Sequence, residues 1–339
     1  MQVGLLGTGR IGRVHALSLM GRVPGARLGM VFDADPTSAE RCVQDFGATG
    51  VAADAHEVLS SSEVDAVLVC TPADTHADFV IRAASAGKAV FCEKPLALDL
   101  AEVDRILAVV ESSGVPFQVG FNRRFDPSFR AVQETVASGG VGEPHMVRIT
   151  SRDNVPPPLA YVQVSGGIFL DMAIHDFDMA RYLMGQEVEE VYATGSVLVD
   201  PEIGRAGDLD TTAITLRFKN GALGMIDNSR QAVYGYDQRV EVFGSEGMAA
   251  CSNETPHRAY RRDERHTFAA NPQYDMFARY TESYVAEMFA FVECVRKGKE
   301  PEVTGRDGRV PLVMGLAAMR SVAERRPVRL DEIDPGEQK

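Results

Sequence analysis

The chain has 339 residues, of which 45% are hydrophobic, and a formal net charge of −13 at neutral pH. This length and apolar content predict two domains with hydrophobic cores. The acidic balance argues against nucleic acid as a partner, because phosphate binding needs a basic surface, and it suits a small neutral substrate.

Targeting signals and cysteines indicate the compartment. The N-terminus lacks a basic region followed by a long apolar core, so we expect no signal peptide. No apolar run reaches the roughly 18 residues that span a bilayer, so we expect no membrane contact. The five cysteines are widely spaced and form no C-x-x-C pair, which supports neither a zinc site nor disulfides. The sequence therefore predicts a cytoplasmic protein without a bound metal.

Up to about residue 121, short apolar strands alternate with helical segments. We expect strands over 3–6, 28–32, 66–70, 89–92 and 117–120, and helices over 11–19, 75–86 and 100–111. Such alternation is typical of a parallel, doubly wound sheet. Residues 1–121 are therefore predicted to form an α/β domain of the Rossmann type.

From about residue 144 the pattern changes to longer alternating segments. These cover 188–198, 213–218, 223–229 and 239–243, and Asn220-Gly221 is a hairpin signal. They predict an α+β domain over residues 122–339, with an antiparallel sheet that carries helices on one face. Two helices, over 284–295 and 309–325, close the chain, and one of them could pack back on the first domain.

A glycine-rich loop follows the first expected strand. Gly7, Gly9 and Gly12 fit G-x-G-x-x-G, and the loop opens a helix. In this context the glycines permit a tight turn and close approach of the backbone to a pyrophosphate, which the helix N-terminus attracts. An ordinary glycine-rich turn is the alternative. We predict that the loop, together with Arg10 and Ile11, binds a dinucleotide.

The second expected strand ends at Asp33, 21 residues after Gly12. A carboxylate there can accept hydrogen bonds from the ribose hydroxyls of the adenosine and would repel a 2′-phosphate. NAD is therefore preferred over NADP. The alternative role for Asp33 is to cap the helix that begins at Pro36, but Asp35 fills that role better.

Two later strands also end in polar residues. Thr71 and Pro72 follow the strand over 66–70, at the edge where nucleotides bind, and His76 opens the next helix. His76 is either a cofactor contact or a polar residue at a helix end. Glu93 and Lys94, which we expect to contact the cofactor, follow the strand over 89–92, and Pro95 after them could adopt the cis form. Lys94 either points into the nicotinamide crevice or is a solvated loop residue.

The segment from Gly166 to Arg181 has helical spacing of its apolar residues. Asp171 and His175 lie four residues apart, which places them on one face of a helix that rises about 5.4 Å per turn. Asp178 extends this face. A carboxylate beside an imidazole can move a proton, although an acidic helical turn and a core histidine would give the same pattern.

The glycine loop, the Glu93-Lys94-Pro95 tripeptide and the segment with Gly167, Asp171 and His175 occur in an order and at distances that resemble one known family. The chain is similar over nearly its whole length to the glucose-fructose oxidoreductase/inositol dehydrogenase (Gfo/Idh/MocA) family. Three stretches, over 120–127, 171–178 and 234–239, are most similar to its inositol-oxidising members.

The resemblance implies NAD-dependent oxidation of myo-inositol to 2-keto-myo-inositol (scyllo-inosose), with hydride transfer to C4 of the nicotinamide. His175 would be the general base, because the pKa of a histidine lies near working pH. Asp171 would stabilise the imidazolium or hydrogen-bond the reacting hydroxyl, and Lys94 would donate to the substrate oxygen. Further substrate contacts are expected from polar side chains that match a polyhydroxylated ring: Arg124, Asn154, Asp178 and Tyr236. Each of these also has a structural explanation, as a surface charge, a turn residue or a sheet-edge aromatic.

Other functions remain open at this point. The enzyme could act on another cyclitol or sugar, such as scyllo-inositol, glucose or levoglucosan. A non-catalytic sensor of NAD and a sugar would not need the Lys94, Asp171 and His175 set. A metal-dependent isomerase or aldolase could use Asp171, His175 and Asp178 as ligands, but it would leave the glycine loop unexplained. The exposed face of the second sheet predicts a homo-oligomer, and the resemblance favours a tetramer.

Overall fold

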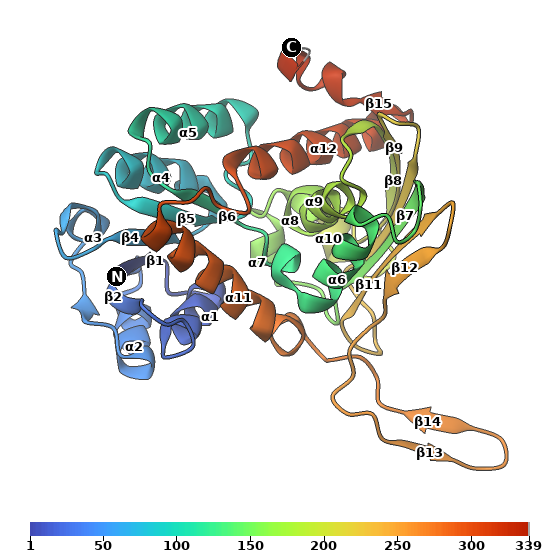
Figure 1. Cartoon of the computed structure of the whole chain (residues 1–339), viewed down its shortest axis with the longest axis horizontal. Coiled ribbons are helices and arrows are strands. Elements are labelled where there is room, and N and C mark those ends of the chain that lie inside the picture. The colour runs from blue at the N-terminus through green and yellow to red at the C-terminus, as the bar shows by residue number, and fades with distance from the viewer. Residues whose placement is uncertain (338–339) are drawn as a thin grey trace. The chain divides into compact units, whose positions relative to one another are not determined.

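The computed structural model describes residues 1–337, and the chain divides into two compact units (Figure 1). Unit 1 comprises residues 1–125 and 281–312. Unit 2 comprises residues 126–280 and the chain from residue 313 onward. Within the described residues, every helix is too short or too polar to span a lipid bilayer.

Unit 1 contains a six-stranded parallel sheet in the order β3-β2-β1-β4-β5-β6. This confirms the predicted doubly wound architecture. The two-residue strand β3 was not predicted, because it is too short to leave an apolar pattern. The strands are β1 (Gln2–Leu6), β2 (Arg27–Phe32), β3 (Gly50–Val51), β4 (Ala66–Val69), β5 (Ala89–Glu93) and β6 (Phe117–Gly120).

Helices cover both faces of this sheet. Apolar residues of α1, α2 and α11 share a buried core with β1, β2, β4 and β5, while α4 packs on α5 over the other face. The helices begin at capping residues: Asp35 and Asp99 accept backbone N–H bonds at the starts of α2 and α5. The helices are α1 (Arg10–Leu19), α2 (Pro36–Phe46), α3 (Ala55–Ser60), α4 (His76–Ser85), α5 (Leu100–Ser113) and α11 (Met276–Lys297), and short 3₁₀ turns lie at η1 (Ala73–Thr75) and η2 (Asn122–Phe125).

The strand order reverses beside β1. Strand β1 pairs with β2 on one side and with β4 on the other, so the chain adds strands first on one side of β1 and then on the other. In open parallel sheets, ligands bind at the carboxyl ends of the strands next to such a reversal. The glycine loop follows β1, Thr71 follows β4, and Lys94 follows β5. These predicted site residues therefore share one edge of the sheet.

Unit 2 contains a seven-stranded sheet in the order β12-β11-β7-β10-β9-β8-β15. The prediction of a purely antiparallel sheet was incomplete, because β7 and β10 pair in parallel. The segment that forms β7 was not predicted as a strand, and the long helical connection that follows β7 lets a later strand run in the same direction. The strands are β7 (Pro144–Arg152), β8 (Val188–Ser196), β9 (Thr211–Phe218), β10 (Leu223–Ser229), β11 (Asp237–Gly244), β12 (Met248–Cys251) and β15 (Val328–Arg329).

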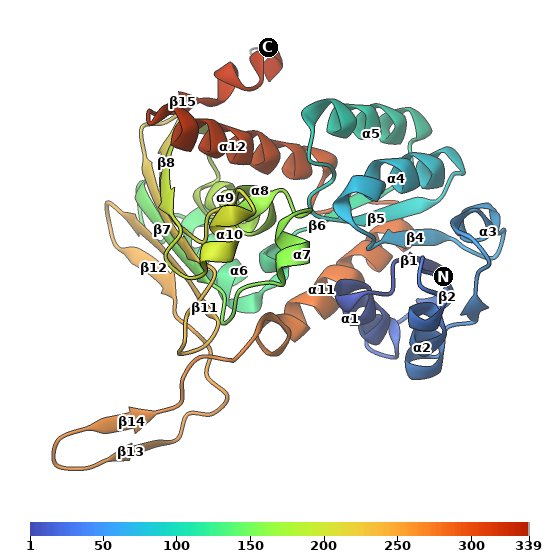
Figure 2. The ribbon, with the colours of Figure 1, turned by 180° about the vertical axis from the view of Figure 1, so that it is seen from behind.

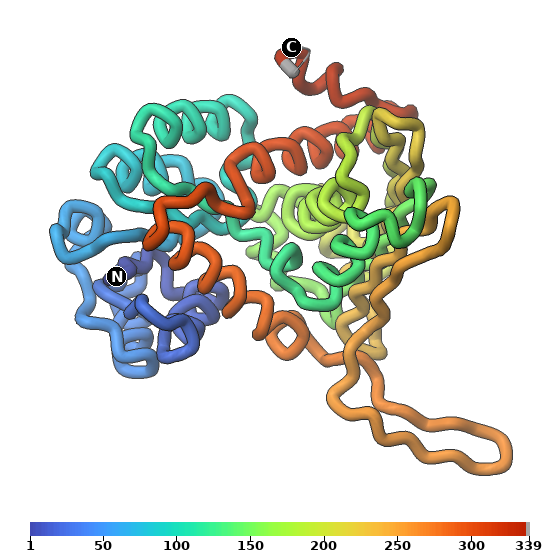
Figure 3. The backbone as a smooth tube through the Cα atoms, viewed as in Figure 1, coloured from blue at the N-terminus to red at the C-terminus, as the bar shows by residue number. Residues whose placement is uncertain are grey.

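Helices of unit 2 lie on one face of this sheet, as predicted (Figure 2). Buried and exposed side chains accordingly alternate along β9, β10 and β11. A separate hairpin of β13 (Tyr260–Arg262) and β14 (Thr267–Ala269) extends away from this sheet (Figure 3). The helical elements are α6 (Pro127–Ala137), α7 (Leu159–Val162), α8 (Gly167–Asp171), α9 (Ala173–Met184), α10 (Pro201–Arg205), α12 (Gly305–Glu324), of which unit 2 holds the part from Val313, and the 3₁₀ turns η3 (Leu330–Glu332) and η4 (Pro335–Glu337).

Candidate active site

The glycine loop between β1 and α1 has the geometry of a phosphate-binding turn. Gly7 has a φ of +90°, and a Cβ at this position would lie 2.6 Å from the carbonyl of Cys70. A Cβ at Gly12 would collide with the carbonyl oxygen of Gly7, so the helix can start this close to the strand only with glycine here. A Cβ at Gly9 would meet no atom within 4 Å. The backbone is therefore tightly packed at Gly7 and Gly12, whereas there is free space beside Gly9. This free space fits a dinucleotide phosphate at the N-terminus of α1.

The carboxylate of Asp33 lies beside this loop. Its Oδ2 accepts hydrogen bonds from the backbone N–H of Thr8 at 2.6 Å and from the Thr8 hydroxyl at 2.9 Å. Its Oδ1 accepts from the N–H of Asp35 at 2.9 Å. Asp35 itself caps α2 by accepting from Thr37, as predicted. These contacts hold the partly exposed Asp33 carboxylate in a defined orientation at the end of β2.

His76 joins two of the predicted cofactor segments. One ring nitrogen lies 2.8 Å from the carbonyl oxygen of Thr71, and the other lies 2.7 Å from that of Pro95. The side chain is buried, and this burial lowers the pKa of His76 although both hydrogen bonds oppose the shift. A neutral imidazole carries one N–H, so it donates to one carbonyl at a time. The visible role of His76 is to tie the loop after β4 to the loop after β5.

Lys94 follows the last residue of β5 and is partly buried. The Lys94–Pro95 peptide bond is cis, which confirms that expectation. Glu93, predicted as a cofactor contact, is buried, and its Oε1 lies 2.6 Å from Nε2 of His15 on α1. The carboxylate of Glu93 thus anchors the end of β5 to the helix that the glycine loop opens.

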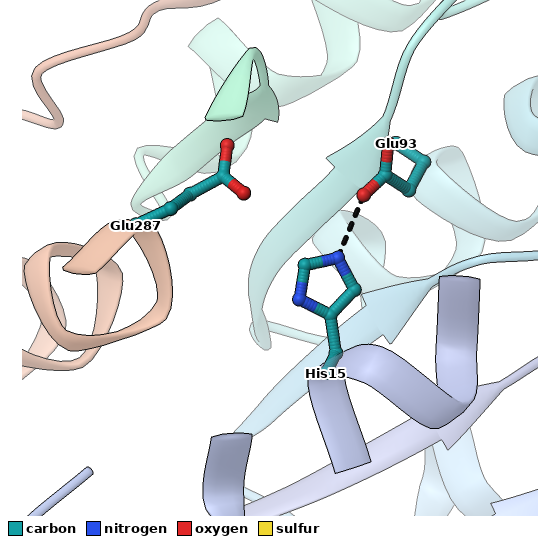
Figure 4. Close-up of side chains that lie close together, drawn as sticks. All are labelled: His15, Glu93 and Glu287. Carbon is teal, nitrogen blue, oxygen red and sulfur yellow. Dashed lines mark hydrogen bonds and ion pairs between the residues drawn. The ribbon is translucent and has the colours of Figure 1, made fainter. Parts of the chain in front are cut away.

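The Glu93 carboxylate belongs to a buried polar cluster within unit 1 (Figure 4). His15 reaches it from α1 and Glu287 from α11, and ligand-type atoms of all three residues lie within 4.8 Å of one another. Burial, followed by the negative charge of Glu93, raises the pKa of Glu287 well above its ordinary value. The neutral form of Glu287 is therefore favoured up to a higher pH than in an exposed glutamate. We call these three residues the Glu93 cluster.

The sequence analysis missed the partners in the Glu93 cluster. Glu287 could have been noticed as an acidic residue within the apolar segment of α11. His15 could have been noticed as a histidine among the residues of α1 that face the core. Glutamate is rarely fully buried, and histidine is intermediate between buried and exposed residue types. Neither signal names its partner, because the two helices come from opposite ends of the chain.

In unit 2, the expected continuous helix with Asp171 and His175 is interrupted. Helix α8 ends at Asp171 and α9 begins at Ala173, with Met172 between them. At this junction the N–H of His175 donates to the carbonyl of Met172, three residues back, instead of four. The prediction of one regular helix was therefore wrong, because the hydrogen-bond ladder changes register at this point. Asp171 is buried and His175 is partly exposed.

Two side chains that the sequence analysis did not identify contact Asp171. The hydroxyl of Tyr161 donates to Oδ1 at 2.7 Å, and Nη1 of Arg230 donates to Oδ2 at 2.9 Å. Tyr161 lies in α7, and Arg230 directly follows β10. A lone arginine at a strand end carries no motif, so only the tertiary structure shows this contact.

The further predicted substrate residues lie in different surroundings. Arg124, expected as either a substrate contact or a surface charge, is buried in unit 1 and pairs with Asp307 at 2.9 Å. Asp178 is buried on α9. Tyr236 is also buried, and its ring packs edge-to-face on Tyr280 with 5.9 Å between ring centres. Asn154 is partly exposed in the turn after β7.

The family comparison covers both units. The sequence profile of the oxidoreductase family with an NAD-binding Rossmann fold matches residues 1–121. The profile of the GFO/IDH/MocA C-terminal domain matches residues 129–250. Together the two profiles match more than half of the chain.

Individual relatives match nearly end to end. The chain is 49% identical to the myo-inositol 2-dehydrogenase of Thermotoga maritima, over 98% of this chain and 99% of the relative. It is 46% identical to the inositol 2-dehydrogenase of Rhizobium meliloti, over 97% and 99%. Its fold matches the crystal structure of scyllo-inositol dehydrogenase from Lactobacillus casei with bound NAD(H) and scyllo-inositol, with a TM-score of 0.91, 27% identity, and coverage of 97% and 99%.

Proposed function

Because this chain belongs to the Gfo/Idh/MocA family of NAD-binding oxidoreductases, we propose that it oxidises myo-inositol to 2-keto-myo-inositol (scyllo-inosose) with NAD. The observation that carries the proposal is the end-to-end match to two inositol 2-dehydrogenases at 49% and 46% identity. The open position at Gly9 supports the choice of a dinucleotide cofactor.

We assign the reaction to three side chains. Bound NAD would supply the hydride acceptor, C4 of its nicotinamide, for the hydrogen of the reacting carbon. His175 removes the hydroxyl proton as general base, so that the alcohol becomes a ketone. Lys94 donates to the substrate oxygen and stabilises its developing negative charge. Asp171 supports the imidazolium or accepts a hydrogen bond from the substrate. The proposal requires Lys94 of unit 1 and His175 of unit 2 to act on one substrate molecule.

The cofactor preference follows from Asp33. Its carboxylate is fixed by Thr8 and by the N–H of Asp35, and further lone pairs remain available for ribose hydroxyls. A 2′-phosphate would meet a negative charge that cannot turn away. We therefore expect a lower KM for NAD than for NADP, and Asp33→Ser should reduce this discrimination.

A substrate panel tests the proposal. Purified enzyme is incubated with NAD and one of myo-inositol, scyllo-inositol, glucose or levoglucosan, and NADH absorbance is followed. The highest kcat/KM should belong to myo-inositol. The match to a structure with bound scyllo-inositol makes that isomer the second candidate, and a higher kcat/KM for it would replace myo-inositol.

Two controls separate the other classes of function. NAD binding without NADH formation from any polyol would indicate a sensor instead of an enzyme. Loss of turnover after exhaustive chelation would indicate a metal-dependent reaction. Unchanged turnover is expected.

We further propose that the protein is a homo-oligomer, with a tetramer favoured, and that the outward face of the unit 2 sheet is its interface. The register of the sheet places a row of exposed apolar side chains on this face: Tyr192, Leu223, Met225, Phe243 and Met248. Exposed apolar side chains that gather on one face of a sheet are typical of an interface. Light scattering should give a multiple of the 36.8 kDa chain mass, and Met225→Glu should reduce it.

The cytoplasm is the compartment we propose. All five cysteines are free thiols in the structure, and four of them are buried. Free thiols are typical of a reducing compartment. Fractionation of the source cells should place the NADH-forming activity with the cytoplasmic enzymes.

A further inference from the structure

The guanidinium of Arg230 is buried and forms a hydrogen-bonded ion pair with the carboxylate of Asp171. Its side chain is 2% exposed, and Nη1 donates to Asp171 Oδ2 at 2.9 Å. Within residues 1–337, its Nε and Nη2 are buried without a hydrogen-bond partner. A guanidinium has five N–H donors, so those on Nε and Nη2 of Arg230 are left without an acceptor in this part of the chain. The one side-chain hydrogen bond that Arg230 makes among the described residues goes to Asp171.

Two further carboxylates lie around the same guanidinium. Asp153 Oδ2 is 3.7 Å from Nη1, and Asp208 Oδ2 is 3.9 Å from Nη2. Burial alone would lower the pKa of Arg230, but the charges of Asp171, Asp153 and Asp208 and the bond to Asp171 raise it above its ordinary value. Arg230 therefore stays positively charged at every pH at which the enzyme can work.

The second oxygen of Asp171 also has a donor. The Tyr161 hydroxyl reaches Oδ1 at 2.7 Å, while Arg230 holds Oδ2. Donors on both oxygens favour the ionised form of a carboxylate and restrict its rotation. A carboxylate oxygen can accept two hydrogen bonds, so one donor on each oxygen does not by itself prevent Asp171 from accepting a hydrogen bond during the reaction.

We propose that Arg230 is a positioning residue that, with Tyr161, keeps Asp171 as an oriented anion during the oxidation. The inference rests on the proposed function, and it narrows the role of Asp171. Asp171 accepts a hydrogen bond, from the substrate hydroxyl or from the His175 imidazolium, and it does not donate a proton. Proton removal from the alcohol is then left to His175.

The experiment compares Arg230→Gln, Arg230→Lys and Tyr161→Phe with the wild type. Arg152→Gln and Tyr260→Phe are matched controls, because Arg152 pairs with Asp227 and Tyr260 lies in the exposed hairpin. We expect Arg230→Gln to lower kcat by about 100-fold, with NAD affinity unchanged. Arg230→Lys should recover part of this loss because it keeps the charge. Tyr161→Phe should lower kcat by about 3- to 10-fold.

A readout without substrate follows the carboxyl group itself. Infrared titration of the substrate-free protein, with Asp171→Asn as the blank, gives the pH at which Asp171 takes up a proton. Both Arg230→Gln and Tyr161→Phe should move this protonation to higher pH, and the larger move should come from Arg230→Gln. A merely structural arginine would change the thermal stability without this shift.

The outcomes separate the two proposals. If the wild type forms no NADH from any polyol, the proposed function fails, and the infrared titration still tests the arginine contact. If the wild type is active and folded Arg230→Gln keeps wild-type kcat and an unchanged titration, the inference is overturned. If Arg230→Gln does not fold, Tyr161→Phe decides, because Tyr161 is exposed and this change removes only its hydroxyl group. A shifted titration supports the inference and an unshifted one overturns it.

Discussion

Each unit of this protein supports a proposed catalytic residue with a buried charged cluster, and the two clusters differ in what carries their charge. In unit 1 the Glu93 cluster combines one imidazole with two carboxyl groups, and its residue Glu93 directly precedes Lys94 in the chain. In unit 2 a guanidinium holds Asp171, with Asp153 and Asp208 nearby. A guanidinium keeps its charge, whereas imidazole and carboxyl groups gain and lose protons.

This difference predicts how strongly each cluster responds to a change of pH. In the unit 1 cluster, burial and the negative charge of Glu93 raise the pKa of Glu287. Its contribution to folding must therefore vary with pH. The unit 2 cluster offers Asp171 the same positive neighbour at every working pH. Stability should depend on pH through unit 1, while the chemistry near Asp171 should be set by a constant charge.

The largest expected effect is a loss of kcat when the proposed catalytic residues His175 and Lys94 are replaced. His175→Ala should lower kcat by about 10²- to 10⁴-fold, because the general base is lost. Lys94→Ala should lower it by about 10²- to 10³-fold, through loss of the donor to the substrate oxygen. NADH formation from myo-inositol measures turnover, and isothermal titration calorimetry measures NAD binding, which should remain. The exposed residues His257 and Lys299 provide matched alanine controls. Near-normal turnover of either active-site variant would refute its assigned role.

His15→Ala should break the unit 1 cluster and lower stability strongly. It removes the partner of Glu93 at 2.6 Å and leaves two buried carboxyl groups facing each other. Leaving the buried Glu93 carboxyl group without this hydrogen bond costs about 1–3 kcal/mol of unfolding free energy. Urea unfolding at pH 7 measures the loss, with exposed His56→Ala of α3 as the control. A loss no larger than that of His56→Ala would show that the contact of His15 with Glu93 is not stabilising.

Glu287→Gln should change the pH dependence of stability, with the smallest effect near pH 5. The pKa of Glu287 is raised in the folded protein from its ordinary 4.5, so the folded state keeps a proton that the unfolded chain releases. Stability is then lost as the pH rises above 4.5, by at most about 1.4 kcal/mol per pH unit. An amide does not titrate, and the variant should therefore gain on the wild type between pH 5 and 8.

Thermal unfolding across this pH range measures the difference between Glu287→Gln and the wild type. Glu282→Gln is the control, since Glu282 is exposed on the same helix. Parallel pH profiles for wild type and Glu287→Gln would mean that Glu287 is ionised in the folded protein, and the contrast between the two clusters would disappear.

Local sequence patterns determined the architecture and the candidate residues. Apolar runs and turn signals are properties of neighbouring residues, so they gave the alternating strands and helices of residues 1–121 and the later strands β8 to β11. The same holds for Gly7, Gly9 and Gly12, whose conformational role is set within one turn. The sequence did not predict two strands. Strand β3 has only two residues, and β7 precedes the helical segment without a hairpin signal.

Only the tertiary structure decided which buried charges meet. Arg230 and Asp171 lie 59 positions apart, and His15 and Glu287 come from helices near opposite ends of the chain. Nothing in either local segment indicates its partner, because an ion pair depends on distance in space and on the loss of water around both groups. The sequence by itself therefore determined the fold type and the residues that can react, whereas chain folding decided the surroundings that orient and charge them.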